Sequence, residues 1–374
     1  MSSNVQVVPQ DLLRKRVQRI EERFEFLRTL LSVLIALVIV LAIVAIVSDE
    51  PLKGISTLLT GPLTSMRRFG NVIELMIPLT FTGLALTIVF KSNRFNLAAD
   101  SAFYFGSMAA CMIGIFSKLP APLTILLALV AGTVAGAIIG YIPAMIGQFF
   151  GANVLVISLM LNYIIGFVVK YLFSYVVRDP NMANQQSLPL PNNVNLGRLV
   201  PGTRIHYGLI IVLVLVALAY IILYKTKWGY ALRTTGANEK FAKYSGIKVP
   251  VVVLLAQVIG TALAGLGGSV EMLGIYKVFL WVETPALGFD GVIIATLAKM
   301  NPKNVPLAAF FLAYIRIGAD ILNRTSDIPA EVVSIVQATI ILLIAAKAFL
   351  VQWKEKEIVK ASEMLAEAKK EVAA

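Results

Sequence analysis

Long apolar runs alternate with short polar connections along most of this chain. Each run is long enough, or nearly so, to cross about 30 Å of hydrocarbon, which takes roughly 20 helical residues. The runs cover residues 27–47, 70–90, 97–117, 121–146, 152–173, 206–224, 250–275, 286–300, 303–322 and 329–351. The run at 286–300 is short enough to predict a partial or tilted span. The pattern therefore predicts an all-α integral membrane protein with about ten transmembrane helices.

The composition supports a polytopic membrane protein. Of the 374 residues, 58% are hydrophobic and only 14% are charged, which is too apolar for a water-soluble globule of this length. A secretory signal peptide has a shorter apolar core followed by a small-residue cleavage site, whereas the first run continues from Leu30 to Val47. We therefore expect the first span to be retained.

Basic residues set the expected topology. The formal net charge is +12, and with ten spans and a cytoplasmic N-terminus most Lys and Arg residues outside the spans fall on the cytoplasmic side. Because such residues accumulate beside spanning helices on that side, we expect both termini to be cytoplasmic.

The same pattern divides the chain into three segments. Residues 1–29 predict a basic amphipathic helix on the anionic cytoplasmic leaflet, residues 30–351 the membrane domain, and residues 352–374 a charged cytoplasmic tail. Within the membrane domain, residues 174–205 form a Pro/Asn-rich external loop. Because anionic lipid explains the basic charge, we expect no nucleic-acid binding.

Small residues recur at helical spacing in two of the predicted spans. Gly132, Gly136 and Gly140 lie in one, and Gly260 and Ala264 lie in the other. In lipid, such spacing lets helices approach closely and associate through packing. We therefore expect close helix contacts along both faces.

Several chemistries are missing from the sequence. It has one His, His206, and one Cys, Cys111, which cannot together build a multi-ligand zinc or iron–sulfur site. It has no G-x-x-x-x-G-K-[ST] phosphate loop and no nucleophile–base set. We expect no enzyme activity and no cofactor in this chain, so that any ATP and Mg²⁺ would be bound by a partner.

Polar residues inside the predicted spans are the candidates for a translocation path. A charged side chain in the bilayer normally faces protein or a wet cavity. The candidates are Asn96, Asp100, Ser158, Asn162, Tyr163, Glu271 and Asp290. The pairs Asn96/Asp100 and Ser158/Asn162 have i, i+4 spacing, so two polar stripes could face one passage, although interhelical structural hydrogen bonds are an alternative. Arg316 and Asp320 have the same spacing, and we expect them to neutralise each other.

A basic, glycine-punctuated segment interrupts the apolar pattern at residues 225–249. Its sequence, with the next residue, is KTKWGYALRTTGANEKFAKYSGIKVP. A cytoplasmic loop is one explanation of the charge. The order of Phe241-Ala242, Gly246 and Pro250 also resembles the short helix-turn-helix that ABC importer permeases insert into a cleft of their ATPase subunit.

Five motifs extend this resemblance to permeases of the nucleoside and simple-sugar type, within the branched-chain amino acid and sugar permease superfamily. They are the 225–249 segment, Arg94-Phe95-Asn96-Leu97, the span Val156 to Ile164, the Gly265 to Gly274 stretch, and Gly288-Phe289-Asp290-Gly291-Val292. They occur in the family's order. One departure lies at Ala98 to Ala102, where the family's G-x-E-G-Q is reduced to a single carboxylate, Asp100.

The resemblance implies a type II importer fold with two non-identical permeases, of which this chain looks like the larger, in the bacterial inner cell membrane. It implies an ABC ATPase subunit as partner and a lipoprotein that delivers a nucleoside or simple sugar. The expected ATPase coupling residues are Arg233, Gly236, Asn238, Glu239, Ala242, Gly246 and Ile247. A monosaccharide or a branched-chain amino acid remains an alternative substrate. An ion-coupled transporter using Asp100, Glu271 or Asp290 is a further alternative, against which the coupling segment argues.

Overall fold

The computed structural model describes residues 38, 39, 42, 51–325, 335, 338 and 339. The first and last predicted spans lie mostly outside these residues, and the 1–29 segment and the 352–374 tail lie wholly outside them. The chain divides into two units, and Ser56–Ile321 form the one described below.

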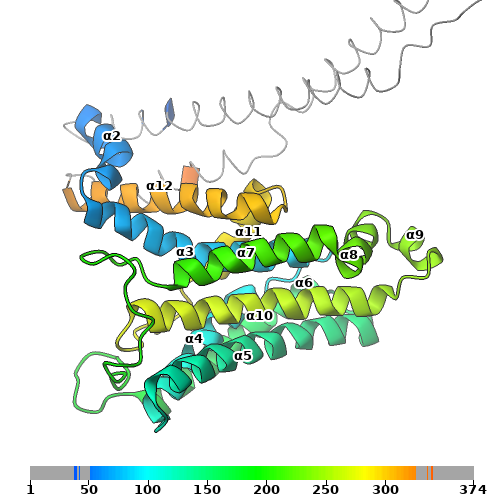
Figure 1. Ribbon diagram of the computed structural model, residues 1–374, viewed down its shortest axis with the longest axis horizontal. Helices are drawn as coiled ribbons and strands as arrows, with labels where there is room; N and C mark the ends of the chain where they lie inside the picture. The colour runs from blue at the N-terminus through cyan, green and yellow to red at the C-terminus, as the bar shows by residue number, and fades with distance from the viewer. Residues whose placement is uncertain (1–37, 40–41, 43–50, 326–334, 336–337, 340–374) are drawn as a thin grey trace, which may run out of the picture. The chain divides into compact units, whose positions relative to one another are not determined.

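The described residues are helical almost throughout and contain no β-strand beyond two isolated bridges, Arg178 with Ser187 and Arg198 with His206 (Figure 1). The elements in chain order are α2 (Pro51–Thr60), η1 (Gly61–Leu63), α3 (Met66–Phe90), α4 (Ala99–Phe116), α5 (Ala121–Phe150), α6 (Val154–Leu172), the π-helical turn η2 (Phe173–Val177), α7 (Gly208–Lys225), α8 (Lys227–Ala237), α9 (Glu239–Tyr244), α10 (Val249–Ile275), α11 (Leu287–Leu297), η3 (Pro302–Asn304) and α12 (Val305–Thr325).

Seven of these helical stretches are long and apolar enough to cross a membrane. They are α3, α4, α5, α6 with η2, α7, α10, and η3 with α12, while α11 is apolar but shorter. This confirms the prediction of an all-α, multi-pass membrane protein, and α11 corresponds to the run predicted to be partial or tilted. The total of ten spans and the cytoplasmic termini stay predictions.

Helix α10 packs against α3, α4 and α5 at the centre of this unit. Close approach depends on the small residues, because a Cβ added at Gly136 would lie 2.4 Å from the carbonyl oxygen of Thr261. One added at Gly140 would lie 1.8 Å from the Thr261 hydroxyl. The predicted small-residue contacts therefore form: the α5 glycines join α5 to α10, and Gly260 of α10 lies against Ala85 and Val89 of α3.

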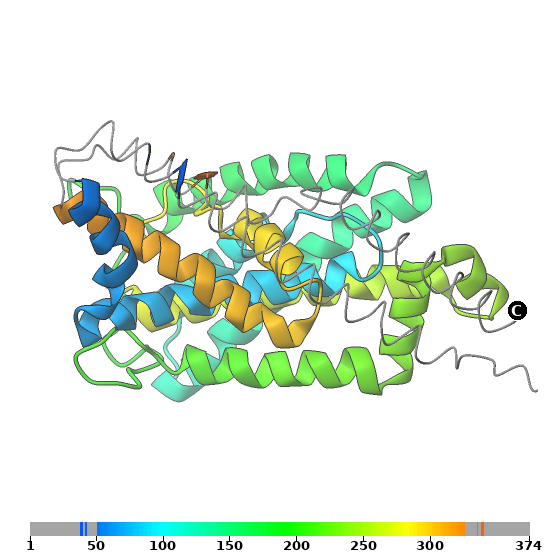
Figure 2. The same cartoon turned by 90° about the horizontal axis from the view of Figure 1, so that it is seen from above.

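Two connections occupy opposite ends of this unit (Figures 1 and 2). The connection from η2 to α7 lies at one end, where Ser187 anchors it by accepting a 2.8 Å hydrogen bond from the backbone N–H of Phe279. Helices α8 and α9 lie at the other end, directly after α7. The predicted external loop and the predicted coupling segment are thus separated by the length of the spanning helices.

Candidate functional site: the buried polar junction and the α8–α9 segment

The first polar feature lies at the N-terminus of α4. The Leu97 N–H donates to Ser158 Oγ at 3.0 Å, and Asn162 Nδ2 donates to the Leu97 carbonyl at 3.1 Å. Asn162 Oδ1 also accepts from the Ser101 N–H at 3.3 Å. Two side chains of α6 therefore satisfy backbone groups of Leu97, which lies just before α4, and of Ser101 in the first turn of that helix.

Asn96 completes this junction on the opposite side. Its Nδ2 donates to Gln257 Oε1 of α10 at 2.8 Å, and its Oδ1 accepts from the Ala98 N–H at 2.9 Å. Both Asn96 and Ser158 are fully buried. We call Asn96, Asp100, Ser158, Asn162 and Gln257 the polar junction. Asn96 lies before the first residue of α4, so it does not share a helical stripe with Asp100 as the spacing predicted. Its side chain bonds to Gln257 and to backbone, while Ser158 and Asn162 bond to backbone alone.

Asp100 joins two helix starts. It lies in the first turn of α4, and its carboxylate accepts from Thr284 Oγ1 at 2.5 Å and from the Gly288 N–H, in the first turn of α11, at 3.0 Å. The N-terminal end of a helix carries partial positive charge, so one carboxylate stabilises both ends. A Cβ at Gly288 would lie 2.2 Å from the Asp100 Cα, and the glycine is what allows this approach.

Asp290 lies in an ion pair with Arg316 of α12. Two guanidinium nitrogens of Arg316 contact the two carboxylate oxygens at 2.5 Å each. The expected mutual neutralisation of Arg316 and Asp320 is therefore corrected: Arg316 reaches across to α11, where a bidentate geometry is possible. Asp290 helps to hold α11 against α12.

The remaining path candidates do not join the junction. Tyr163 is 75% exposed and lies next in sequence to the buried Asn162, so it faces outward from α6. Glu271 is buried in α10, and its Oε2 has no hydrogen-bond partner among the described residues. A path role for any of these residues stays a prediction.

The α8–α9 segment is held in shape by its own polar residues. Thr226 caps α8 by accepting from the Gly229 N–H at 3.1 Å, and Asn238 caps α9 by accepting from the Phe241 N–H at 3.0 Å. Gly236 lies against the connection between α3 and α4, where a Cβ would be 2.0 Å from the Lys91 carbonyl oxygen. Arg233 lies over the Tyr224 ring, with its Cζ 4.9 Å from the ring centroid.

The tip of the segment buries one of the expected coupling residues and leaves another open. Ala242 is fully buried, and its carbonyl accepts from the Ile247 N–H at 3.0 Å. Gly246 is open to its surroundings and has φ +80°, a conformation that favours glycine. Its exposed aromatic side chains are Phe241 at 57% and Tyr244 at 91%. Ala242 and Gly246 therefore shape the turn, while Phe241 and Tyr244 add aromatic rings to its exposed surface.

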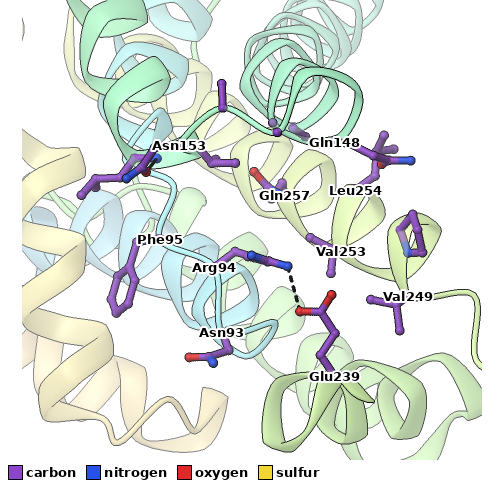
Figure 3. A pocket seen from close by; sticks show the side chains of 17 residues that line it. Asn93, Arg94, Phe95, Gln148, Asn153, Glu239, Val249, Val253, Leu254 and Gln257 are labelled. Atoms are coloured by element: carbon purple, nitrogen blue, oxygen red, sulfur yellow. Dashed lines mark hydrogen bonds and ion pairs between the residues drawn. The ribbon is translucent and has the colours of Figure 1, made fainter. Parts of the chain in front are cut away.

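One ion pair links this segment to the polar junction. Arg94 Nη2 lies 2.8 Å from Glu239 Oε2 (Figure 3). Arg94 lies in the connection that leads to Asn96, and Glu239 is the first residue of α9. Glu239 thereby contacts the short stretch of chain that leads into α4.

A pocket of about 760 Å³ opens beside this ion pair (Figure 3). Connections and helix ends from α3 to α6, together with α9 and α10, line it. Its polar lining consists of Asn93, Arg94, Gln148, Asn153, Glu239 and Gln257. Gln257 belongs to both pocket and junction, and among the described residues its Nε2 donates no hydrogen bond. Most of the polar lining is neutral amide, and the two charged groups pair with each other.

These features define a multi-pass membrane subunit with a structured loop at one end of its helices. No group of three or more His, Cys, Asp or Glu residues that could hold a metal ion occurs in the part of the chain that the structure describes. Residues 68–345 match the family described as "Branched-chain amino acid transport system / permease component". The chain belongs to this family.

Relatives with assigned functions support the same class of protein. The chain is 30% identical to the guanosine ABC transporter permease protein NupP of Bacillus subtilis, over 85% of this chain and 92% of that protein. It is also 30% identical to the nucleoside ABC transporter permease protein NupB of Lactococcus lactis, covering 84% and 89%. The glucose ABC transporter permease protein TsgB13 of Haloferax volcanii is 28% identical, covering 87% and 88%.

The expected class is thereby confirmed. The chain is an ABC transporter permease, a multi-pass membrane subunit and not an enzyme. Permease components of ABC transporters work with ATPase subunits, which agrees with a coupling segment in this chain.

Sequence reasoning missed three contributors to the site. Gln257 and Thr284 each place one polar group against a predicted path residue, and Arg94 was noted only as part of a motif. Gln257 is a lone amide within the apolar run 250–275, a signal that the cost of burying polar groups in lipid could have identified. Thr284 lies in a connection, where no periodicity singles it out.

Proposed function

We propose that this chain forms part of the translocation path of an ATP-driven importer for a nucleoside, in the cytoplasmic membrane of a bacterium. It acts with a second, non-identical permease, with an ATPase subunit that binds ATP and Mg²⁺, and with a lipoprotein that delivers the substrate. The observation that carries the substrate class is the pair of relatives named for guanosine and nucleosides, each matched over most of its length.

The chemistry of the pocket supports a neutral substrate rich in hydrogen-bonding groups. Amides from α5, α6 and α10 line it through Gln148, Asn153 and Gln257, and amides offer both donors and acceptors. Its volume of about 760 Å³ lies in the range of small-molecule sites. We place the release of substrate at this pocket, on the same side as α8 and α9.

A simple sugar is the second candidate, favoured by the relative named as a glucose permease. Neutral amides suit sugar hydroxyls as well as ribose hydroxyls, so the pocket alone does not decide between the two. A charged amino acid fits less well, because the only charged lining groups, Arg94 and Glu239, pair with each other.

Reconstitution tests the proposal. The full chain is co-purified with an ATPase, a second permease and a binding lipoprotein encoded beside it, then placed in vesicles with labelled guanosine or labelled glucose outside. We expect guanosine uptake that requires ATP and Mg²⁺ and that an ionophore does not change. Uptake of glucose alone would select the second candidate, and uptake that continues without ATP and collapses with an ionophore would contradict an ATP-driven importer.

Gln148 tests the pocket within the same assay. Gln148→Leu removes a donor and an acceptor at roughly constant volume, at an exposed position on the pocket wall. If substrate pairs there, uptake falls about tenfold or more, while assembly and ATP hydrolysis persist. Gln185→Leu, on the external connection, serves as the matched control and should transport normally. Unchanged uptake by Gln148→Leu would remove this pocket from the path.

A further inference from the structure

A second pocket, of about 320 Å³, lies between the end of α3, α8 and the connection that follows α11. Three cationic side chains line it, from Lys91, Arg94 and Arg233, together with apolar groups that include Phe90, Phe95 and Met300. We call it the cationic pocket. It lies on the same side of the molecule as α8 and α9.

The positive charge of the cationic pocket is only partly balanced. Arg94 pairs with Glu239, but neither Lys91 nor Arg233 pairs with a carboxylate within residues 51–325. Lys91 has a pKa below its ordinary value, because burial disfavours its charged form and the nearby Arg233 adds like-charge repulsion. An anion bound between the two side chains would offset the cost of burying the Lys91 charge and would weaken its repulsion from Arg233.

Two tyrosines of α7 mark how far along this spanning helix the cations lie. Tyr220 and Tyr224, one turn apart near the end of that helix, have ring centroids 5.0 Å apart. Lys91 Nζ lies 6.0 Å from the Tyr224 centroid, on the ring that Arg233 also covers, and Lys303 Nζ lies 4.0 Å from the Tyr220 centroid. Tyrosines are enriched where spanning helices meet the headgroups, and cations over their rings gain further attraction.

Apolar groups border the cations within the pocket itself. Phe90 and Met300 line it beside Lys91 and Arg233. Phe95, at 56% exposed, places a further apolar ring beside the cationic pocket. The cations therefore stand at a boundary between charged and apolar surroundings, as a lipid headgroup does.

We propose that the cationic pocket binds the phosphate group of an anionic phospholipid from the cytoplasmic leaflet. Lys91 and Arg233 hold the phosphate oxygens, and Lys303 adds charge from the neighbouring ring. Basic pockets between helices on this side are suited to such headgroups. A free phosphate ester has the same charged group, but it lacks the apolar chains that Phe90, Phe95 and Met300 would contact.

Lipid binding to the full-length chain tests this directly. Phosphatidylglycerol or phosphatidylcholine is titrated onto the purified protein in detergent, and bound lipid is counted by native mass spectrometry. We expect phosphatidylglycerol to be retained preferentially. Lys91→Gln/Arg233→Gln should bind it roughly 10- to 30-fold more weakly.

A matched control separates this pocket from diffuse charge. Lys225→Gln/Lys227→Gln removes two exposed cations from the same side of the molecule and should leave binding unchanged. Equal weakening by both pairs, or none by either, would overturn the proposal. So would displacement of the lipid by glycerol 3-phosphate as readily as by phosphatidylglycerol, because the site would then recognise a soluble phosphate.

Two further measurements guard against misfolding and against a protein ligand. A phosphatidylglycerol analogue with a photoreactive headgroup should label residues 90–95 or 233–237 of the unmodified protein, and labelling elsewhere alone would contradict the assignment. If Lys91→Gln/Arg233→Gln loses its ATPase subunit while phosphatidylglycerol binding stays unchanged, the pocket serves an acidic side chain of that subunit, and the lipid proposal fails.

Discussion

The polar junction and the α8–α9 segment are both islands of polar residues in an apolar chain, yet the structure uses them differently. At the junction, Asn162 and Ser158 form hydrogen bonds with the backbone of Leu97, just before α4. In α8–α9, the polar residues Thr226 and Asn238 also cap helices, but aromatic side chains remain exposed. Polar side chains inside a membrane domain first form hydrogen bonds with the chain's own backbone. A docking surface is therefore to be sought among the side chains that stay exposed.

The largest expected effect comes from removing the exposed aromatic residues of α9. Phe241→Ala/Tyr244→Ala should weaken binding of the ATPase subunit by about 100-fold or more, because buried aromatic anchors dominate interface energetics. The thermal stability of the isolated permease should not change, since neither ring is buried within it. Binding is measured by titrating the ATPase onto permease variants held in nanodiscs.

Tyr175→Ala provides the control for that experiment. Tyr175 is 79% exposed and lies in η2, at the opposite end of the spanning helices, so its removal should leave ATPase binding intact. If the α9 double variant binds the ATPase as tightly as the unmodified permease does, the α8–α9 segment is not the docking surface, and the contrast with the junction disappears.

Asn162→Leu gives the next largest effect and tests the junction. It removes a donor and an acceptor and leaves the Leu97 carbonyl and the Ser101 N–H without their partners, at about 1–3 kcal/mol for each. Uptake should fall roughly ten- to a hundredfold. The thermal unfolding temperature decides the cause: if it falls with uptake, the role is structural, whereas an unchanged temperature with a raised KM indicates contact with substrate. Normal uptake and normal stability together would contradict both roles.

Much of this architecture could be predicted from the sequence, because span length and small-residue spacing follow from the bilayer itself. The run 286–300 was correctly singled out as short, and Gly132, Gly136 and Gly140 do pack against α10. The pairing of Arg316 could not be predicted. Its partner Asp290 lies on another helix, and i, i+4 spacing points only along the same one, toward Asp320.

The sequence predicted which residues belong to the candidate site better than it predicted where their side chains point. Asn96, Ser158 and Asn162 all lie around the start of α4, but spacing could not show that their side chains bond to Gln257 and to backbone. That depends on where α4 begins, because Ser158 accepts from the N–H of Leu97, which precedes the helix, and Asn162 accepts from the N–H of Ser101 in its first turn. The burial of Ala242 could not be predicted for a similar reason: α9 is a single short helix, and the elements packed against it decide which of its faces is buried.

The smallest effect is expected at the Arg94–Glu239 ion pair, which connects the two regions compared here. Both side chains are substantially exposed, at 46% and 55%, so water screens the pair and its contribution to stability is about 0–1 kcal/mol. Glu239→Gln should therefore leave folding and ATPase docking nearly unchanged. If the pair transmits movement of α9 to the start of α4, uptake per ATP hydrolysed should nevertheless fall, by a few-fold at most.

Exchanging the two charges distinguishes a loss of coupling between α9 and the start of α4 from the mere loss of one carboxylate. Arg94→Glu/Glu239→Arg restores an opposite-charge pair, so it should recover coupling that Arg94→Glu alone loses, and raised salt should reduce the coupling of both the unmodified and the exchanged protein. The coupling ratio is measured as labelled substrate imported per phosphate released in the same vesicles. If the single and exchanged variants show the same ratio at every salt concentration, the ion pair does not link the α8–α9 segment to the polar junction, and the two regions act independently.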